Sequence, residues 1–391
     1  MAEIALEPFS EAELRRLSGI KWRRDGDAAL PAWVADMDIR SPACIRDAVT
    51  DLVAAADLGY NRAVTEAVTP AFVSWQERHH GWTPDLDRLQ LFCDVLHAID
   101  TALWLHTEPG DGIVLLTPVY PPFLKAVADG GRRLVDVPLD PDGWRLDPER
   151  LAAAIDDSTR AILLCSPHNP TGRVFDPAEL AAIAEVAERH DLLIISDEVW
   201  ADLLHPGADH TPMATLGPEV ENRTLTISSA SKAFNTAGLR CAVAHIGHPG
   251  LHRAIDSLPQ HYLGAVSSPG AVAAVAAWEQ GEPWLALLRD HLGERRRQLA
   301  ARLAAEAPEI GWQQPEATYL AWLDLRATAA GRRGDIEPAE LVRAETGLVL
   351  SPGPDFGVHG SGFARLNFAT SAEILDRIVD RLVAGVAATG G

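Results

Sequence analysis

Residues 192–198 read Leu-Leu-Ile-Ile-Ser-Asp-Glu, a short apolar run that ends in two carboxylates. Similar runs recur from about residue 90 to residue 250 and alternate with stretches of helical periodicity. This alternation predicts a parallel sheet with helices on both faces. The expected strands cover residues 113–116, 134–137, 161–165, 192–196, 225–228 and 242–246.

The helix between the third and fourth of these strands has a clear start signal. Asp176 can cap its N-terminus and Pro177 fits its first turn, so we expect a helix from Pro177 to Arg189. In an open parallel sheet, ligands bind beyond the carboxyl ends of the strands. The loops at 166–172, 197–202 and 229–235 should therefore converge on one site.

Composition and charge exclude several classes of function. The 391 residues carry a formal net charge of -21, which repels nucleic acid and anionic membranes. No apolar run approaches the roughly 20 residues that span a bilayer, and the acidic N-terminus does not resemble a signal peptide. The four cysteines are scattered without metal-ligand spacing, so we expect free thiols and no metal site. The sequence predicts a soluble cytoplasmic protein.

Lys232 is the first candidate for chemistry. It lies in the small-residue loop Ser229-Ala-Ser-Lys232 after an expected strand, and a second cation, Arg240, follows it. A confined lysine near another cation has a lowered pKa and can form a Schiff base. Alone, the pattern also fits a solvated loop lysine, as Asp197 alone fits a helix cap and Ser166-Pro-His-Asn-Pro-Thr-Gly172 alone fits a turn.

Together, these three segments resemble those of fold-type I pyridoxal 5′-phosphate (PLP) enzymes of the aminotransferase class I/II superfamily. Further strings resemble its MalY/PatB group, which is best known for cystathionine β-lyases and cysteine-S-conjugate β-lyases. They are Lys21-Trp22, Leu30-Pro-Ala-Trp-Val-Ala-Asp-Met-Asp38, Gly59-Tyr60, Pro118-Val-Tyr-Pro-Pro-Phe123, Lys232-Ala-Phe-Asn-Thr-Ala-Gly-Leu239, Ala317-Thr-Tyr-Leu-Ala-Trp-Leu-Asp324 and Phe363-Ala-Arg-Leu-Asn-Phe-Ala-Thr370.

The resemblance implies an α/β fold with a large PLP-binding domain and a smaller α+β domain. The large domain, residues 46–284, would be a three-layer α/β/α unit around a mostly parallel seven-stranded sheet. Residues 285–391 would form the small domain together with an N-terminal segment, residues 1–45. A helical pattern over residues 284–306 predicts the connector between them.

The resemblance also implies how the ring of PLP is held. Lys232 would carry the Schiff base and later act as the base that takes the α-proton. Asp197 would pair with the pyridine nitrogen, and Asn169 would hydrogen-bond the phenolic oxygen and border the substrate. Tyr120 would stack on the ring. We expect Lys232, Tyr120 and Asp197 to be the catalytic residues.

The phosphate would be bound by side chains and by a helix N-terminus. The backbone N–H groups of Val95 and Leu96 would contribute at the start of a helix, with the side chain of Asp94 pointing away from the phosphate. The side chains involved would be those of Ser229, Ser231 and Arg240. Tyr60 would reach the phosphate from the neighbouring subunit, which implies a homodimer with shared active sites.

Arg365 would clamp the substrate α-carboxylate, with the backbone of Val34 and Ala35 nearby. The alternative is a surface arginine on an edge strand, but apolar residues on both sides favour the clamp. Trp200 stands where the group usually has histidine or tyrosine, and an indole cannot accept a hydrogen bond or act as a base. Trp200 therefore either shapes the substrate pocket or turns aside and fills space.

The expected function is β-elimination from L-cystathionine or another cysteine S-conjugate, which gives a thiol, pyruvate and ammonia. An aminotransferase is the alternative, because the same residues would serve it. A natural-product relative that cleaves bulky thiol conjugates, or that runs decarboxylating or oxidative chemistry, also remains open. A regulatory binding protein on the same fold is less favoured, because Lys232 and Asp197 are both present.

Overall fold

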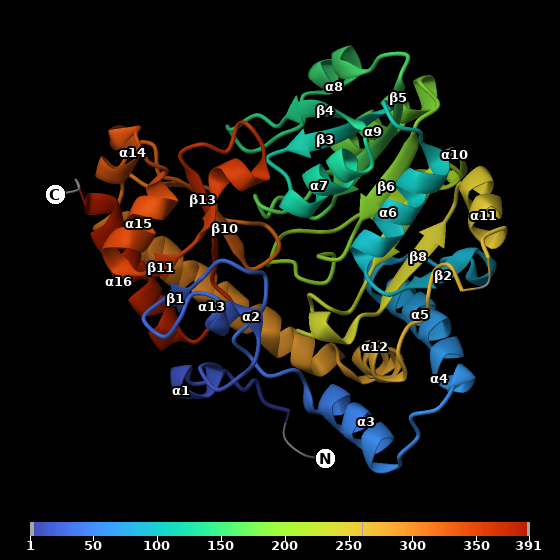
Figure 1. Cartoon of the computed structure of the whole chain (residues 1–391), viewed down its shortest axis with the longest axis horizontal. Coiled ribbons are helices and arrows are strands. Elements are labelled where there is room, and N and C mark those ends of the chain that lie inside the picture. Colours follow the sequence, from blue (N-terminus) through green and yellow to red (C-terminus); the bar gives the residue numbers. More distant parts are fainter. Residues whose placement is uncertain (1–3, 260, 389–391) are drawn as a thin grey trace.

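The computed structural model describes residues 4–259 and 261–388. Its largest sheet has seven strands in the order β2-β8-β7-β6-β5-β3-β4 (Figure 1). Strand β8 runs antiparallel to both of its neighbours, and the other pairs are parallel. The strands are β2 (Leu89–Phe92), β3 (Gly112–Thr117), β4 (Arg133–Pro138), β5 (Thr159–Cys165), β6 (Leu193–Asp197), β7 (Thr224–Ser228) and β8 (Ala242–Ile246).

All six expected strands are present, and the mostly parallel seven-stranded sheet is confirmed. The pattern missed β2, which is four residues long and lies at the edge of the sheet, where only Phe92 is buried. An edge strand buries little apolar surface, so its sequence carries a weak signal.

Helices cover both faces of this sheet, as alternating side chains along β3 show. Ile113 and Leu115 belong to the core under α6 (Val95–His106) and α7 (Pro121–Asp129). Val114 and Leu116 belong to a separate core with α8 (Pro148–Ala154) and α9 (Pro177–Arg189). The strand is therefore apolar throughout because both of its faces are buried.

Helix α9 has the expected bounds. The side chain of Asp176 accepts from the N–H groups of Ala178 and Glu179, and the Glu179 side chain reciprocates to complete a capping box. The other helices preceding α13 are α1 (Glu11–Leu14), α2 (Ile20–Arg23), α3 (Ala43–Ala54), α4 (Arg62–Glu66), α5 (Val68–His80), α10 (Pro218–Glu221), α11 (Pro249–Asp256) and α12 (Ser268–Gln280).

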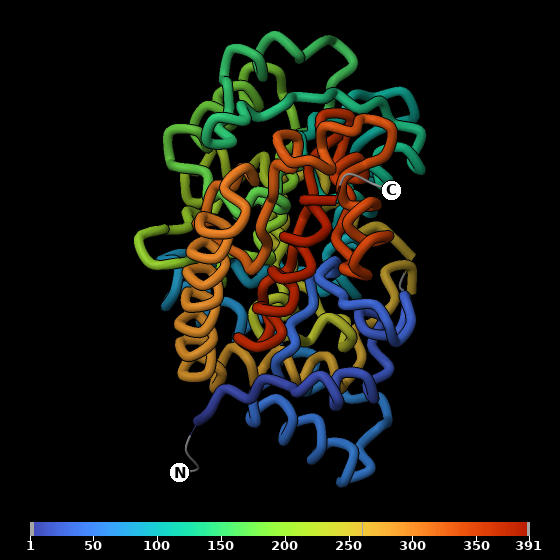
Figure 2. Tube along the Cα trace, turned by 90° about the vertical axis from the view of Figure 1, so that its left-hand side faces the viewer, coloured from blue at the N-terminus to red at the C-terminus, as the bar shows by residue number. Residues whose placement is uncertain are grey.

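A second, antiparallel sheet is built from the C-terminal part of the chain in the order β12-β13-β10-β9. Its strands are β9 (Gly311–Trp312), β10 (Leu320–Asp324), β12 (Ser351–Pro352) and β13 (Phe363–Asn367). The helices around it are α13 (Glu282–Glu306), α14 (Ala329–Arg333), α15 (Pro338–Thr346) and α16 (Ala372–Ala387). Helix α13 confirms the expected long helix and runs beside α16 (Figure 2).

The N-terminal segment joins this C-terminal part of the chain. Strand β1 (Leu30–Pro31) pairs in parallel with β11 (Leu348–Val349). The segment that follows β1 then passes to the carboxyl end of the large sheet, where it borders the candidate site. Residues far apart in the sequence thus meet at one place.

The sequence also made predictions about membrane-spanning helices, cysteines and metal-binding clusters, and the structure describes all three features for residues 4–259 and 261–388. No helix among them is long and apolar enough to cross a membrane. The four cysteines, Cys44, Cys93, Cys165 and Cys241, are all free. Residues 4–259 and 261–388 contain no cluster of three or more side chains that could hold a metal ion.

Candidate active site

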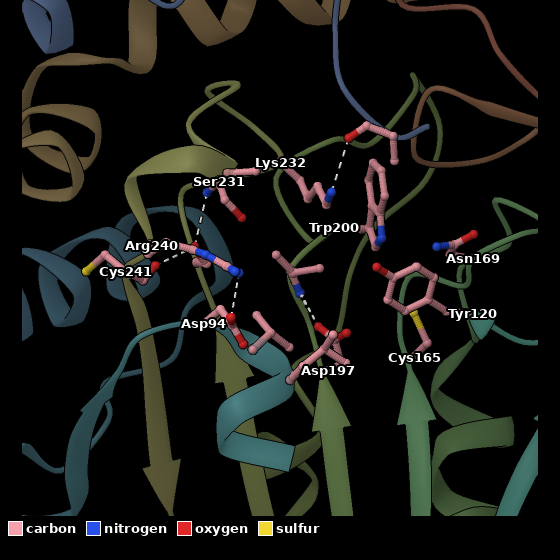
Figure 3. Close-up of a pocket in the computed structure, with 16 residues that line it drawn as sticks. Asp94, Tyr120, Cys165, Asn169, Asp197, Trp200, Ser231, Lys232, Arg240 and Cys241 are labelled. Carbon is pink, nitrogen blue, oxygen red and sulfur yellow. Dashed lines mark hydrogen bonds and ion pairs between the residues drawn. The ribbon is translucent and has the colours of Figure 1, made fainter. Parts of the chain in front are cut away.

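A cavity of about 200 Å³ opens at the carboxyl ends of the parallel strands. The three loops that the sequence predicts to converge all contribute to its wall, with Asn169, Asp197 and Lys232 among the lining residues. Figure 3 shows Arg240, Ser231 and Asp94 at one end, and Tyr120, Asn169 and Trp200 at the other. Lys232 and Asp197 lie between these two groups.

Lys232 presents its amine to the cavity. Its Nζ donates to the carbonyl of Ala35 over 3.1 Å and lies 5.6 Å from the centre of the Trp200 ring. Desolvation lowers the pKa of this amine, and the nearby Arg365 guanidinium acts in the same direction. A lysine with a lowered pKa in a cavity has the properties of a nucleophile and of a base. The alternative of a solvated loop lysine is excluded by this placement.

Asp197 ends β6 with its carboxylate in the same cavity. Burial raises its pKa to about 7, while the backbone N–H of Val199, at 3.1 Å from Oδ1, and the charge of Lys232 oppose this shift. A buried carboxylate gains most from a cationic partner. The cavity face of Asp197 therefore suits a protonated ring nitrogen.

The opposite end of the cavity can hold an anion. Helix α6 begins there with Val95 and Leu96, so its positive N-terminal end faces the cavity. Ser229 and Ser231 line the same end, and the hydroxyl of Ser229 donates to the carbonyl of Cys241 over 2.6 Å.

Asp94 lies at this end too, and the expectation that its side chain points away is wrong. Its Oδ1 accepts from the N–H of His97 at 2.8 Å and caps α6. Its Oδ2 lies 2.5 Å from Nη1 of Arg240, so the carboxylate holds the arginine at the edge of the cavity. Asp94 thus orients Arg240, whose backbone adopts a left-handed φ of 57°.

Arg365 on β13 is buried and approaches the cavity behind Asn169. Its Nη1 donates to Oδ1 of Asn169 at 2.8 Å, and its Nη2 donates to the carbonyl of Trp33 at 2.8 Å. Its Nε has no partner among the described residues, and desolvation lowers its pKa to about 10. A buried guanidinium with no carboxylate at ion-pair distance in the described chain is suited to bind an anionic ligand. The alternative of a surface arginine is excluded.

The segment from Val34 to Asp38 contributes Ala35 to the cavity lining and is held from several sides. The Asn367 side chain donates to the carbonyls of Val34 and Asp36, each at 2.7 Å. At the end of the segment, Lys21 makes a buried ion pair with Asp38 at 2.9 Å. Lys21, Asp38 and Asn367 belong to the sequence strings that resemble the family, but the sequence assigned them no role. These contacts show that they hold the segment from Val34 to Asp38 in place.

Tyr319 is a residue of the site that sequence reasoning missed. Its buried hydroxyl donates to the carbonyl of Ala35 at 2.9 Å, so Tyr319 and Lys232 share one acceptor. Its presence within the string from Ala317 to Asp324 was the available signal. Tyr319 does not itself line the cavity; the lining residues to which the sequence assigned no role in the site are Val199, Ala237, Cys165 and Cys241.

Trp200 lines the cavity and does not turn aside. Its ring is buried and packs edge-on against Tyr319, with a centroid distance of 4.9 Å and an interplanar angle of 71°. Tyr120 lies near it at the start of α7, and burial raises the pKa of the Tyr120 phenol, which therefore stays protonated. The two aromatic side chains lie close together at this end of the cavity.

Tyr60 is not part of the cavity of its own chain. It is fully exposed and lies beside a separate surface hollow formed by residues 58–62, 65 and 265–269. Val34 does not line the cavity, and its carbonyl accepts from the Asn367 side chain.

The residues present fit pyridoxal 5′-phosphate. The observation that carries this fit is the cavity itself, with a buried carboxylate and an amine in its middle and a helix N-terminus with an arginine at one end. These groups match, in order, a basic ring nitrogen, an aldehyde and a phosphate. The short ion pair between Asp94 and Arg240 means that a phosphate would share this arginine.

Comparisons with known proteins agree with this fit. The family model "Aminotransferase class I and II" matches residues 58–382. Cystathionine beta-lyase PatB of Bacillus subtilis is 33% identical over 94% of this chain and 96% of its own length. A PLP-bound C-S lyase from Staphylococcus hominis has a TM-score of 0.90 at 27% identity, covering 97% of this chain and 98% of its own. A putative PLP-dependent beta-cystathionase from Corynebacterium diphtheriae has a TM-score of 0.91 at 29% identity, covering 99% and 100%.

Proposed function

The chain belongs to the aminotransferase class I and II family, and we propose that it is a PLP-dependent carbon–sulfur β-lyase. It cleaves L-cystathionine or another cysteine S-conjugate with water to a thiol, pyruvate and ammonia. The observation that carries the chemistry is the placement of the Lys232 amine and the Asp197 carboxylate in one cavity, with the buried Arg365 behind it. The relatives named as cystathionine β-lyases and C-S lyases support the choice of reaction.

Arg365 would bind and orient the substrate. Its unpartnered Nε and its two terminal nitrogens provide donors for the α-carboxylate, in a site where burial strengthens a charge-assisted hydrogen bond. A carboxylate held beside Asn169 would fix the orientation of the substrate relative to Lys232, which lines the same cavity. Orientation of this kind contributes to catalysis because only one of the three bonds from Cα to hydrogen, the carboxylate and Cβ is to be broken in this step.

Lys232 would hold the cofactor covalently in the resting protein and then take the proton from the substrate Cα. Its lowered pKa supports this role, since a base must be unprotonated before it accepts a proton. The bound cofactor supplies the electron sink for the electrons that this proton leaves behind. Asp197 would maintain a positive charge on the ring nitrogen, and Tyr120 would cover one face of the ring.

The phosphate would be held by Ser229, Ser231 and Arg240 together with the N-terminus of α6. Trp200 would form the wall against the sulfur substituent, because it lines the cavity near Tyr120 and contacts Tyr319. An indole wall favours apolar over anionic substituents, since it offers a π-face and a single N–H donor.

We propose further that the working form is a homodimer with shared active sites. Tyr60 and Leu58 are exposed and line one surface hollow, and a second, apolar hollow is lined by Ala63, Val64 and Val272. Neighbouring exposed apolar side chains and apolar hollows are typical of protein–protein interfaces, and a second copy of the chain would bury them. Tyr60 would then reach the phosphate of the partner's cofactor.

The decisive experiment incubates the purified holoenzyme with L-cystathionine and a panel of S-substituted cysteines, without any keto acid. We expect continuous release of pyruvate and thiol in equal amounts. The Lys232→Ala variant is the control for release that does not depend on the site. A single burst that continues only when keto acid is added would show an aminotransferase and overturn the proposal.

A further inference from the structure

Two cysteines lie opposite each other where strands β2 and β8 end. The antiparallel register of these strands closes with the pair Phe92 and Ala242. In an antiparallel ladder, one step forward on one strand meets one step back on the other. The next pair in this register is therefore Cys93 with Cys241, although the two residues are far apart in the sequence.

The two chain segments stay together beyond these cysteines. The next residues in the same register, Asp94 and Arg240, are joined by the ion pair of 2.5 Å between Oδ2 and Nη1. The cysteine pair thus has a backbone-paired position on one side and an ion pair on the other. Opposed residues of antiparallel strands have Cα atoms roughly 4.5–5.5 Å apart, within the range of roughly 4.4–6.8 Å that a disulfide requires.

The side chains of this pair lie outside the candidate active site. The sulfur of Cys241 points away from Lys232 and the rest of the cavity (Figure 3), while its backbone carbonyl accepts from Ser229. Sγ of Cys93 lies 3.7 Å from the carbonyl oxygen of Ala265, a weak contact that leaves the sulfur available. Directly opposed residues of a ladder project from the same face, so the two thiols face each other's side of the strands.

The two thiols differ in their access to solvent. Cys93 is partly exposed and Cys241 is buried. Burial raises the pKa of the Cys241 thiol to about 12, and the neighbouring Cys93 acts in the same direction. A reagent from solution therefore meets Cys93 first, and Cys241 is placed to react with a group already attached to Cys93.

The other two cysteines are elsewhere in the fold. Cys165 ends β5, which is separated from β8 by β7 and β6. Three strand spacings put these strands about 14 Å apart, too far for a disulfide. Cys44 lies on α3, which packs against α12, and is partly exposed like Cys93. Cys44 therefore serves as a matched control for thiol exposure.

We propose that Cys93 and Cys241 form a reversible disulfide when the protein meets a low-molecular-weight disulfide. The Cys93 thiolate attacks one sulfur of the reagent, forms a mixed disulfide and releases one thiolate. The Cys241 thiolate then attacks the Cys93 sulfur and releases the second. Two protein thiols lose two electrons and two protons, and the S–S bond of the reagent is reduced to two thiols.

The disulfide ties together the two segments that carry Asp94 and Arg240 at the anion-binding end of the cavity. Release of a bound phosphate is easier when these segments can separate, so the bond slows the loss of PLP. This consequence rests on the proposed function, because it concerns the cofactor. The formation of the disulfide does not.

The test treats the full-length protein, with PLP bound, with glutathione disulfide. Free thiols are then alkylated under denaturing conditions, and the peptides are mapped by mass spectrometry. We expect a peptide pair joined through Cys93 and Cys241, the loss of two of the four alkylatable thiols, and reversal by dithiothreitol. The bond should form faster as the pH rises above about 7, because Cys241 must ionise. Cys44→Ser should form it as the wild type does.

Two variants separate the steps. Cys241→Ser should stop at the mixed disulfide and keep one glutathione on Cys93, and Cys241→Ala should do the same if serine disturbs the fold. In Cys93→Ser, Cys241 should stay unmodified. A folded wild type that retains glutathione on Cys93, leaves both thiols free, or links either of them to another cysteine would overturn the proposal.

The effect on the cofactor is measured as the rate at which PLP leaves the protein after dilution. Oxidised wild type should lose PLP severalfold more slowly than reduced wild type, and the oxidant should not change the rate in Cys93→Ser. Equal or faster loss from protein that carries the mapped bond would refute the tie at the anion-binding end. The bond can be mapped without PLP or turnover, so a protein that binds no PLP would contradict only the proposed function.

Discussion

Arg365 donates from Nη1 to Oδ1 of Asn169 over 2.8 Å, although 196 positions separate the two residues. The contact joins β13 of the smaller sheet to the loop after β5 of the larger one. The proposed carboxylate clamp and the proposed partner of the cofactor's phenolic oxygen therefore have a fixed spacing. A change at either residue should alter how the substrate lies relative to Lys232.

Arg365→Ala should lower kcat/KM for a cysteine S-conjugate by about 100-fold, equivalent to roughly 3 kcal/mol, because a buried charge-assisted contact to the substrate is lost. Binding of PLP should persist, since Arg365 does not line the cofactor cavity. Steady-state kinetics and the absorbance of bound PLP measure these two effects. Arg326→Ala, at an exposed arginine of the same lobe, is the control. Unchanged kcat/KM in Arg365→Ala would exclude the clamp.

Lys232→Ala should abolish turnover and covalent attachment of PLP. After treatment with borohydride, mass spectrometry of the wild type should show a fixed adduct, and the variant should show none. Lys125→Ala, at an exposed lysine that pairs with Asp129, should behave as the wild type. An adduct that persists in Lys232→Ala would show that a different lysine binds PLP covalently.

Tyr60→Phe and Lys232→Ala should complement each other in mixed dimers if the active site is shared. A mixed dimer contains one site with an intact Lys232 and the Tyr60 hydroxyl of the other subunit. We expect activity to rise when the two variants are unfolded, mixed and refolded together. Each mixed dimer should regain one working site. Each variant refolded alone is the control. If the mixture has only the average activity of the two variants, Tyr60 does not contribute to the active site of the other subunit.

Trp200→Phe should change the preference among sulfur substituents more than it changes the reaction. The smaller ring leaves space beside Tyr319, so kcat/KM for bulky conjugates should rise relative to that for small ones. Partial loss of packing should cost on the order of 1 kcal/mol of unfolding free energy. The substrate panel and thermal unfolding check both effects. An unaltered ranking of substrates would remove Trp200 from the substrate pocket.

Asp197 should make the stability of the cofactor-free protein depend on pH. Its pKa is raised to about 7 by burial, whereas an unfolded chain has an ordinary aspartate pKa near 4. The folded state thus binds the extra proton, so the stabilising contribution is complete below about pH 4 and is lost as the pH rises through about 7. The change in melting temperature that Asp197→Asn causes should therefore be more positive at pH 8 than at pH 4.

The control for this prediction is Asp157→Asn at an exposed position. It should leave the difference between pH 4 and pH 8 unaltered. His168, His205 and His245 act in the opposite direction, because burial lowers the pKa of each to about 4 and their contribution is lost as the pH falls. Comparing each variant with the wild type at the same pH removes this background.

Much of the fold could be read from local patterns. The six apolar runs and the start of α9 at Asp176 and Pro177 appear in the sequence because burial on both faces and helix capping each impose a short, local pattern. The convergence of the loops that carry Asn169, Asp197 and Lys232 followed from the rule that parallel strands end at one edge. The short edge strand β2 escaped because it is scarcely buried.

The chain order alone therefore determined which residues lie at the carboxyl edge of the sheet. Only the tertiary structure decided how their side chains pair: Arg240 with Asp94, Arg365 with Asn169, Lys232 and Tyr319 with one carbonyl, and Glu198 with His210. Local periodicity is imposed by hydrogen bonding and burial within a few residues, so a sequence displays it. A contact across 146 or 196 positions depends on how separately formed elements pack, and no short stretch of sequence records it.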